Sequence, residues 1–85
     1  MPYHIIIEKT ARKELQKINR NEQISITQSI LSLANEPRPV GCIKLKGREA
    51  WRIRIGDYRV IYEIKDNQLI IVVITIGHRK DVYKK

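Results

Sequence analysis

The stretch WRIRIGDYR, residues 51–59, alternates apolar and basic residues on both sides of a Gly-Asp dipeptide. Alternation is typical of a strand with one buried face, and Gly-Asp is among the dipeptides that form two-residue hairpin turns. The stretch therefore predicts a β-hairpin with its apolar side chains on one face and its arginines on the other. The expected cross-strand pairs are Ile55 with Tyr58, Arg54 with Arg59, Ile53 with Val60 and Trp51 with Tyr62.

The facing arginines of this hairpin carry the first functional signal. Two guanidinium groups directly opposite one another on a sheet repel, at a cost of about 0.2–1 kcal/mol when they are exposed. Folding alone gives no reason to accept that cost at Arg54 and Arg59. We therefore expect an anionic ligand between them, with Arg52 on the same face.

Charge and length extend this interpretation. The chain has 85 residues, with 17 Lys and Arg against 9 Asp and Glu, a formal net charge of +8 and 42% hydrophobic residues. This is too short for two domains and apolar enough for one core, so we expect a single domain over residues 1–85. A clustered basic excess is typical of phosphate binding, although a solvated basic surface explains the composition equally well. The cluster comprises Lys44, Lys46, Arg48, Arg52, Arg54 and Arg59.

The few cysteines and histidines limit the chemistry. Cys42 is the only cysteine, and His4 and His78 are the only histidines, so we expect no intrachain disulfide, no metal site and no other cofactor. The apolar runs are too short to cross a bilayer, and the first residues lack the basic segment of a signal peptide. We therefore expect a cytoplasmic protein without membrane contact.

Hydrophobic periodicity predicts the remaining elements. The fold class that follows is α+β, in the order β-α-α-β-β-β-β, with two N-terminal helices packed on one face of a mainly antiparallel twisted sheet. Asn21 is the expected N-cap of the second helix. The expected elements are a strand at 3–7, helices at 10–19 and from 21 to about 34, a proline-rich connector at 35–39, and strands at 42–45, 50–55, 58–64 and 69–76.

The last of these strands is apolar at nearly every position, which predicts burial on both faces. Continuing the hairpin register through a turn at Asp66 and Asn67 pairs Ile64 with Leu69. It also predicts two further pairs, Tyr62 with Ile71 and Val60 with Val73. The face opposite the helices then carries the arginines beside exposed aliphatic residues, which a partner or the C-terminal tail would have to cover; we expect a protein partner. These aliphatic residues are Ile61, Ile70, Val72 and Ile74.

Four segments resemble the RelE toxin family of the RelE/ParE superfamily: ARKELQKI (11–18), KLKG (44–47), WRIRIGDYRVIYEI (51–64) and ITIGHRKDVY (74–83). The resemblance implies a RelE-like fold and the toxin of a type II toxin–antitoxin module. It further implies a ribosome-dependent endoribonuclease that cleaves mRNA in the A site through 2′-OH attack on the adjacent phosphate and so inhibits translation. The implied partners are the ribosome, mRNA and a neutralising RelB-like antitoxin.

The resemblance also implies residue roles. The functional arginines of the family match Arg59 and Arg79, and its catalytic tyrosine matches Tyr83. Two lysines of the family fall on Arg52 and Arg54, which is a departure from the pattern. Together with Lys44, Lys46 and Arg48, these two residues are our candidates for RNA binding.

Metal-free RNA cleavage needs a base, an acid and cations that stabilise the charged phosphorane. Arginines grip phosphate oxygens but are poor proton donors, so the candidate proton carriers are Tyr83 and His78. We favour Tyr83 as the base, whereas His78 can be an acid, a base or a phosphate donor. A surface histidine and a C-terminal tyrosine that packs on the sheet are the structural alternatives.

Two other classes of function stay open. A ParE-like toxin that poisons DNA gyrase by protein binding would share the fold without nuclease chemistry. A simple basic nucleic-acid-binding module would explain the charge but not the facing arginines. The match of Arg59, Arg79 and Tyr83 to nuclease positions favours the endoribonuclease.

Overall fold

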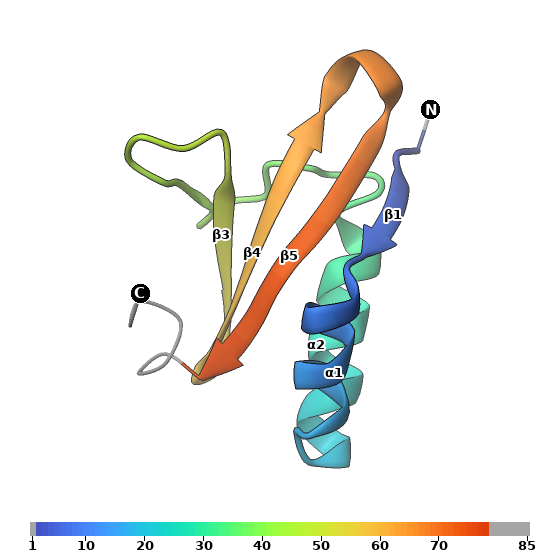
Figure 1. Ribbon diagram of the computed structural model, residues 1–85, viewed down its shortest axis with the longest axis vertical. Helices are drawn as coiled ribbons and strands as arrows, with labels where there is room; N and C mark the ends of the chain where they lie inside the picture. The colour runs from blue at the N-terminus through green and yellow to red at the C-terminus, as the bar shows by residue number, and fades with distance from the viewer. Residues whose placement is uncertain (1, 79–85) are drawn as a thin grey trace.

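A mixed five-stranded sheet with two helices on one face forms the protein in the computed structural model (Figure 1), which describes residues 2–78. The sheet order is β1-β5-β4-β3-β2, with β1 parallel to β5 and every other pair antiparallel. This is the predicted α+β architecture, with two N-terminal helices on one face of a mainly antiparallel sheet. The elements are β1 (His4–Ile7), α1 (Lys9–Gln16), α2 (Arg20–Ser32), β2 (Ile43–Lys44), β3 (Trp51–Ile55), β4 (Tyr58–Lys65), a 3-10 turn (Asp66–Gln68) and β5 (Ile70–His78).

The β3–β4 hairpin has the predicted register. Arg54 pairs with Arg59, and the three other expected pairs are also present. Gly56 begins the turn with φ at +61°, a conformation that glycine adopts without steric cost. Local sequence therefore determines this hairpin fully.

The α2 helix begins earlier than predicted, because Asn19 and not Asn21 is its N-cap. The Asn19 side-chain oxygen accepts a hydrogen bond from the backbone N–H of Glu22 at 3.1 Å, and its amide donates to the Glu22 carboxylate at 2.9 Å. This reciprocal pair satisfies the free N–H groups of the first turn. The first helix correspondingly ends at Gln16 rather than residue 19, and β2 is shorter than predicted.

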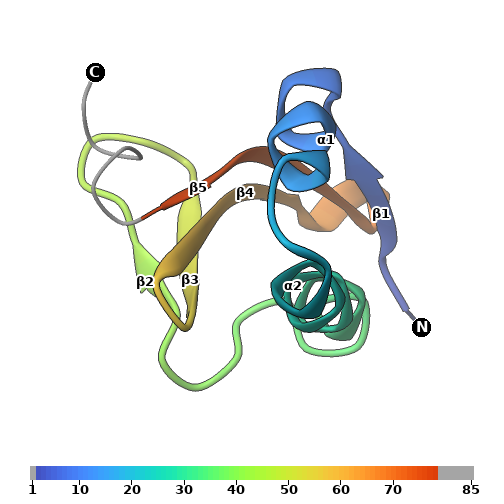
Figure 2. The same cartoon turned by 90° about the horizontal axis from the view of Figure 1, so that it is seen from below.

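The core lies between the helices and the sheet. From α2, Ile26, Ile30 and Leu33 are buried as the periodicity predicted. Figure 2 shows both helices on the same side of the sheet, with α1 against β5. The sheet supplies the other wall of the core, namely Ile53, Val60, Tyr62, Ile71, Val73 and Ile76.

The register between β4 and β5 differs from the prediction. The turn is longer than expected, because Asp66–Gln68 form a 3-10 turn and Leu69 adopts a left-handed conformation with φ at +55°. Ile64 therefore pairs with Ile71 instead of Leu69, and Tyr62 with Val73 instead of Ile71. A β-bulge between residues 61 and 62 then shifts the register once more.

The shifted register leaves the predicted core face largely intact. A displacement of two residues keeps Ile71 and Val73 on the helix side, since side chains alternate with a period of two. The bulge brings Ile76 opposite Val60, where it too is buried.

The predicted exposed aliphatic patch is wrong. Ile61 is only 3% exposed, and the three β5 residues assigned to the patch are half-buried. These three residues are Ile70, Val72 and Ile74. Their half-burial also means that the second face of β5 is more exposed to solvent than the apolar sequence of the strand predicted.

A polar cluster ties the connector to the β4–β5 turn. The Arg38 guanidinium donates to the Asp66 carboxylate at 2.9 Å, and the Tyr3 hydroxyl donates to the same carboxylate at 2.6 Å. Arg38 also lies over the Trp51 ring, 5.1 Å from its centre. Both donors, Arg38 first, hold the pKa of Asp66 below its ordinary value.

We expect Asp66→Asn to lower the melting temperature at neutral pH, by an amount that shrinks in acid. A lowered folded-state pKa contributes stability above the ordinary pKa of an aspartate, and this stability is lost as the pH falls through the folded value. Thermal unfolding of both proteins at neutral pH and at a pH below the ordinary aspartate pKa measures the difference. Glu36→Gln removes a charge close to the connector and is the control. A difference that does not change with pH would contradict the role of the ionised carboxylate.

Candidate phosphate-binding site on the open face of the sheet

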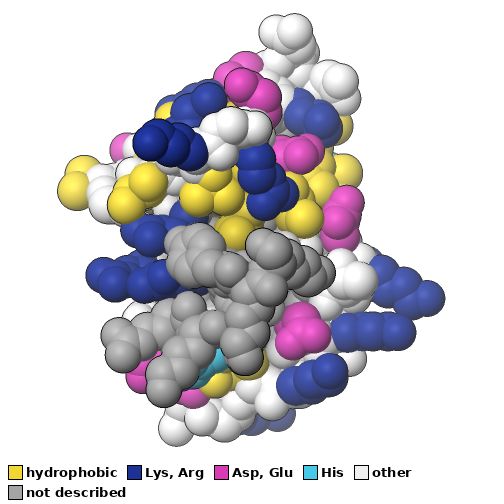
Figure 3. Space-filling model, turned by 60° about the vertical axis from the view of Figure 1, so that its left-hand side comes forward, with side chains coloured by type: hydrophobic (Ala, Val, Ile, Leu, Met, Phe, Trp, Pro, Cys, Tyr) yellow, Lys and Arg dark blue, Asp and Glu magenta, His cyan; other side chains and the backbone are white. Residues whose placement is uncertain are grey.

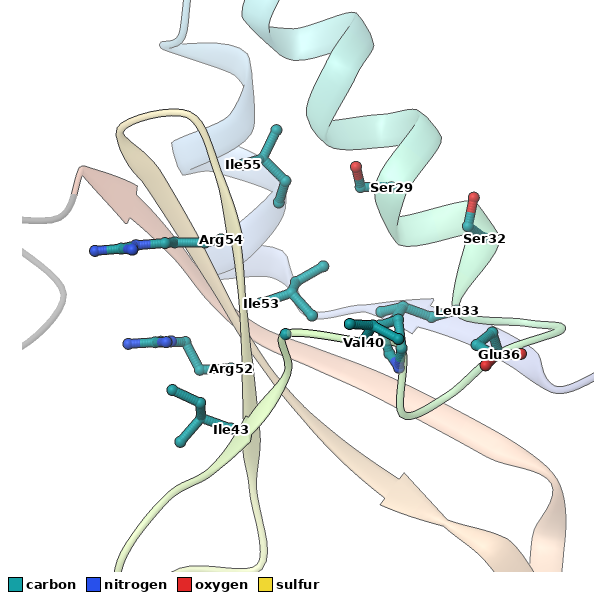
Figure 4. A pocket seen from close by; sticks show the side chains of 12 residues that line it. Ser29, Ser32, Leu33, Glu36, Val40, Ile43, Arg52, Ile53, Arg54 and Ile55 are labelled. Carbon is teal, nitrogen blue, oxygen red and sulfur yellow. The ribbon is translucent and has the colours of Figure 1, made fainter.

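Three arginines stand on the face of the sheet that the helices leave open. Arg54 of β3 lies directly opposite Arg59 of β4, and Arg52 follows two residues before Arg54. Figure 4 shows Arg52 and Arg54 projecting side by side away from α2, while Ile53 and Ile55 point toward that helix. The alternation that buries the isoleucines therefore also aligns the guanidinium groups.

The arginines differ in their surroundings. The cross-strand neighbours of Arg52 are Ile43 and Ile61, whereas those of Arg59 are Arg54 and Gly77. Arg52 and Arg59 are half-buried and their Nε atoms are shielded from solvent, while Arg54 is exposed. The surroundings of the three arginines thus differ, with aliphatic neighbours around Arg52 and a second arginine opposite Arg54.

This arrangement suits a phosphate. A guanidinium stays protonated and presents a planar fork that matches two phosphate oxygens. An anion between Arg54 and Arg59 would replace their mutual repulsion with two favourable interactions. We name Arg52, Arg54 and Arg59 the arginine row.

The other predicted RNA-binding residues lie on β2 and in the loop that follows it. Lys44 pairs with Trp51, so its side chain starts from the helix side of the sheet, and its Nζ lies 3.4 Å from the Glu49 carboxylate. Lys46 and Arg48 are exposed in the loop between β2 and β3. Figure 3 shows basic side chains around hydrophobic ones on this side of the molecule.

The structure places His78 away from the arginine row. Its cross-strand partner is Tyr58, whose ring packs against the core, and the two rings meet edge to face at 5.7 Å. The imidazole therefore lies on the helix side at the end of β5. Arg79 and Tyr83 fall outside the described residues.

A cavity of about 510 Å³ lies between α2, the segment after the connector and the edge of β3. Ser29, Ser32 and Val40 line it together with Ile53 and Ile55. The arginines border it through β3 but point the other way (Figure 4), so it is separate from the phosphate site. The cavity reflects the short β2, which pairs with only two residues of β3. The hydrophobic periodicity did not predict that β2 would be so short.

Within residues 2–78, no group of three His, Cys, Asp or Glu side chains is placed to hold a metal ion. None of the helices in this range is long and apolar enough to cross a membrane.

Fold and site together define a small basic α+β protein with a RelE-like fold and an arginine-lined open sheet face. A family profile described as the ParE toxin of type II toxin–antitoxin systems matches residues 5–83. The chain therefore belongs to the RelE/ParE superfamily of type II toxins, as the resemblance of its motifs implied.

Its relatives include RelE and RelG toxins. Toxin RelG of Mycobacterium tuberculosis is 32% identical over 89 residues, with 100% of both chains covered. The Escherichia coli K12 mRNA interferase toxin RelE is 24% identical over 90 residues, which cover 100% of this chain and 94% of that protein. A chain of the archaeal RelE–RelB complex from Pyrococcus horikoshii matches with a TM-score of 0.84 and 30% identity, covering 96% of this chain and 100% of its own.

Proposed function

We propose that this toxin is a ribosome-dependent endoribonuclease that cleaves mRNA in the A site and thereby inhibits translation. The observation that carries the proposal is the placement of Arg54 directly opposite Arg59 on the open sheet face. A protein that acts only by binding another protein has no need for a site suited to phosphate. A distant relative that bears the name mRNA interferase supports the same activity.

The proposed reaction needs no metal. A base takes the proton of a ribose 2′-OH, the oxygen attacks the adjacent phosphorus, and the 5′-oxygen leaves with a proton from an acid. Arg54 and Arg59 would hold the phosphate and stabilise the charge that develops on its equatorial oxygens. Arg79 would add a further cation, by its match to the family pattern.

Tyr83 is our proposed base, by its match to the catalytic tyrosine of the family, and a phenol hydroxyl can carry a proton where a guanidinium cannot. The packing of His78 against Tyr58 on the helix side favours a structural role for His78 over proton transfer. His78 stays our candidate for the acid.

The surrounding basic residues would guide the RNA. Lys46 and Arg48 extend from an exposed loop, which suits contacts to phosphates beyond the cleaved one. Lys44 would join them by leaving its exposed ion pair with Glu49, a contact that contributes little in solvent. Because translating ribosomes are the substrate, the toxin would act in the cytoplasm.

A RelB-like antitoxin is the proposed partner. A RelE relative from Pyrococcus horikoshii was crystallised with RelB. The net charge of +8 favours a partner that is acidic where it meets the arginine row. Such a partner would neutralise the toxin by occupying the phosphate site.

Brief expression of the toxin, followed by primer extension on a translated message, tests the function. We expect discrete cuts that disappear when the start codon of that message is removed, because cleavage requires a ribosome on the message. Cuts that persist on the untranslated message would contradict ribosome dependence.

The matched ParE profile supports a second candidate, a toxin that poisons DNA gyrase. Inhibition of purified gyrase by this toxin, together with an intact message in the primer-extension assay, would replace the endoribonuclease proposal with this one.

A further inference from the structure

We propose that Arg52 and Arg54 form a stacking slot for a single nucleobase, next to the phosphate held by Arg54 and Arg59. The slot rests on the proposed function in one respect, namely that the ligand is RNA. It assigns these two arginines a task that differs from a simple phosphate clamp.

The spacing of the two side chains matches one aromatic ring. Residues two apart on a strand rise by about 6.7 Å, since each residue adds about 3.3–3.4 Å. A ring placed between two planar groups needs a contact distance of about 3.5 Å on each side. Figure 4 shows both side chains projecting from β3 in the same direction. The rise between the two residues therefore leaves room for one base between their side chains.

The neighbours of Arg52 favour a base over a second phosphate. Ile43 and Ile61 flank it on the adjacent strands, and Ile43 is 49% exposed. A phosphate placed there would meet the exposed apolar surface of Ile43, whereas the flat, weakly polar face of a base is compatible with that surface. Half-burial also limits the rotamers of Arg52, so less conformational freedom is lost when a base stacks on it.

Arg54 then belongs to both parts of the site. Arg54 is the cross-strand partner of Arg59 and lies two residues from Arg52 along β3. A nucleotide whose phosphate lies between Arg54 and Arg59 can place an adjacent base against Arg52. The phosphate and the base of one nucleotide unit would thus contact different but neighbouring arginines.

Stacking requires arginine. The guanidinium is planar and stacks on aromatic faces, whereas the lysine ammonium is a compact, strongly hydrated charge. The presence of arginines where related toxins carry lysines therefore changes how a base is held while keeping the charge. Because every base has a π face, we expect the slot to tolerate all four bases.

The test is binding of a short single-stranded RNA that carries 2-aminopurine at one position and 2′-O-methyl groups that prevent cleavage. A matched RNA has an abasic site at that position. We expect the wild-type toxin to quench the 2-aminopurine fluorescence and to bind it about 10- to 100-fold more tightly than the abasic RNA, in line with the worth of one stacked base. Moving the label along the RNA identifies the nucleotide in the slot.

Charge-preserving substitutions separate stacking from attraction. Arg52→Lys and Arg54→Lys are expected to remove most of the quenching and of the preference over abasic RNA. Arg20→Lys, in α2 on the helix side, should retain both. An equal affinity of the wild type for the two RNAs, or a preference that survives both lysine substitutions, would overturn the slot.

The slot and the nuclease proposal can fail separately. Quenching that depends on the arginines, together with an intact message in the primer-extension assay, supports the slot and contradicts the nuclease. Ribosome-dependent cuts in the wild type, with no arginine-dependent preference for a base, support the nuclease and contradict the slot.

Discussion

Arg59→Ala should slow cleavage of ribosome-bound mRNA by about 10²–10³-fold, the usual loss when one stabilising group is removed from a transition state. Arg59 lies opposite Arg54 on the open sheet face, so its removal leaves the developing phosphorane charge with one clamp fewer. Single-turnover cleavage on programmed ribosomes measures this loss. Growth after induction provides the matching cellular readout.

The fold of this variant should remain stable. Substitution removes some packing of the half-buried side chain but also relieves the repulsion with Arg54, so we expect a change within about 1 kcal/mol. Urea unfolding measures it. Arg20→Ala, which removes the same charge from α2, should affect neither cleavage nor unfolding. A large loss of stability together with activity would place Arg59 in the structural core and contradict the phosphate role.

Tyr83→Phe should slow the same single-turnover reaction by about 10²–10⁴-fold, the usual contribution of a positioned acid or base. The substitution removes only the hydroxyl, so binding to the ribosome should hardly change. His78→Ala serves as the comparison. Because His78 packs on Tyr58 at the helix side, we expect this variant to lose stability more than it loses rate. Near-normal cleavage by Tyr83→Phe together with a collapse in His78→Ala would transfer the proton-carrier role to His78.

Features that depend on residues close together in the sequence could be predicted best. The β3–β4 hairpin was predicted pair by pair, because a two-residue turn with glycine at its first position allows only one register. The buried stripe of α2 followed from helical periodicity alone. The N-cap was misplaced by two residues, since Asn19 and Asn21 are both good caps and only the reciprocal contact with Glu22 selects the first.

The second turn was less predictable. The sequence around Asp66 and Asn67 indicates a turn but not its length, and the left-handed Leu69 belongs to no common turn signature. The later β-bulge, between Ile61 and Tyr62, has no signal in the local sequence. These two features decided that Gly77 of β5 lies opposite Arg59.

Sequence by itself determined the parts of this toxin that depend on neighbours within a few residues. These are the α+β class, the hairpin register and the alignment of Arg52, Arg54 and Arg59 on one face. Only the tertiary structure decided the side of the sheet on which His78 lies, the burial of Ile61 and the placement of Ile43 beside Arg52. The physical reason is that strand pairing between distant segments depends on turn length, bulges and core packing, which a period-two pattern does not encode.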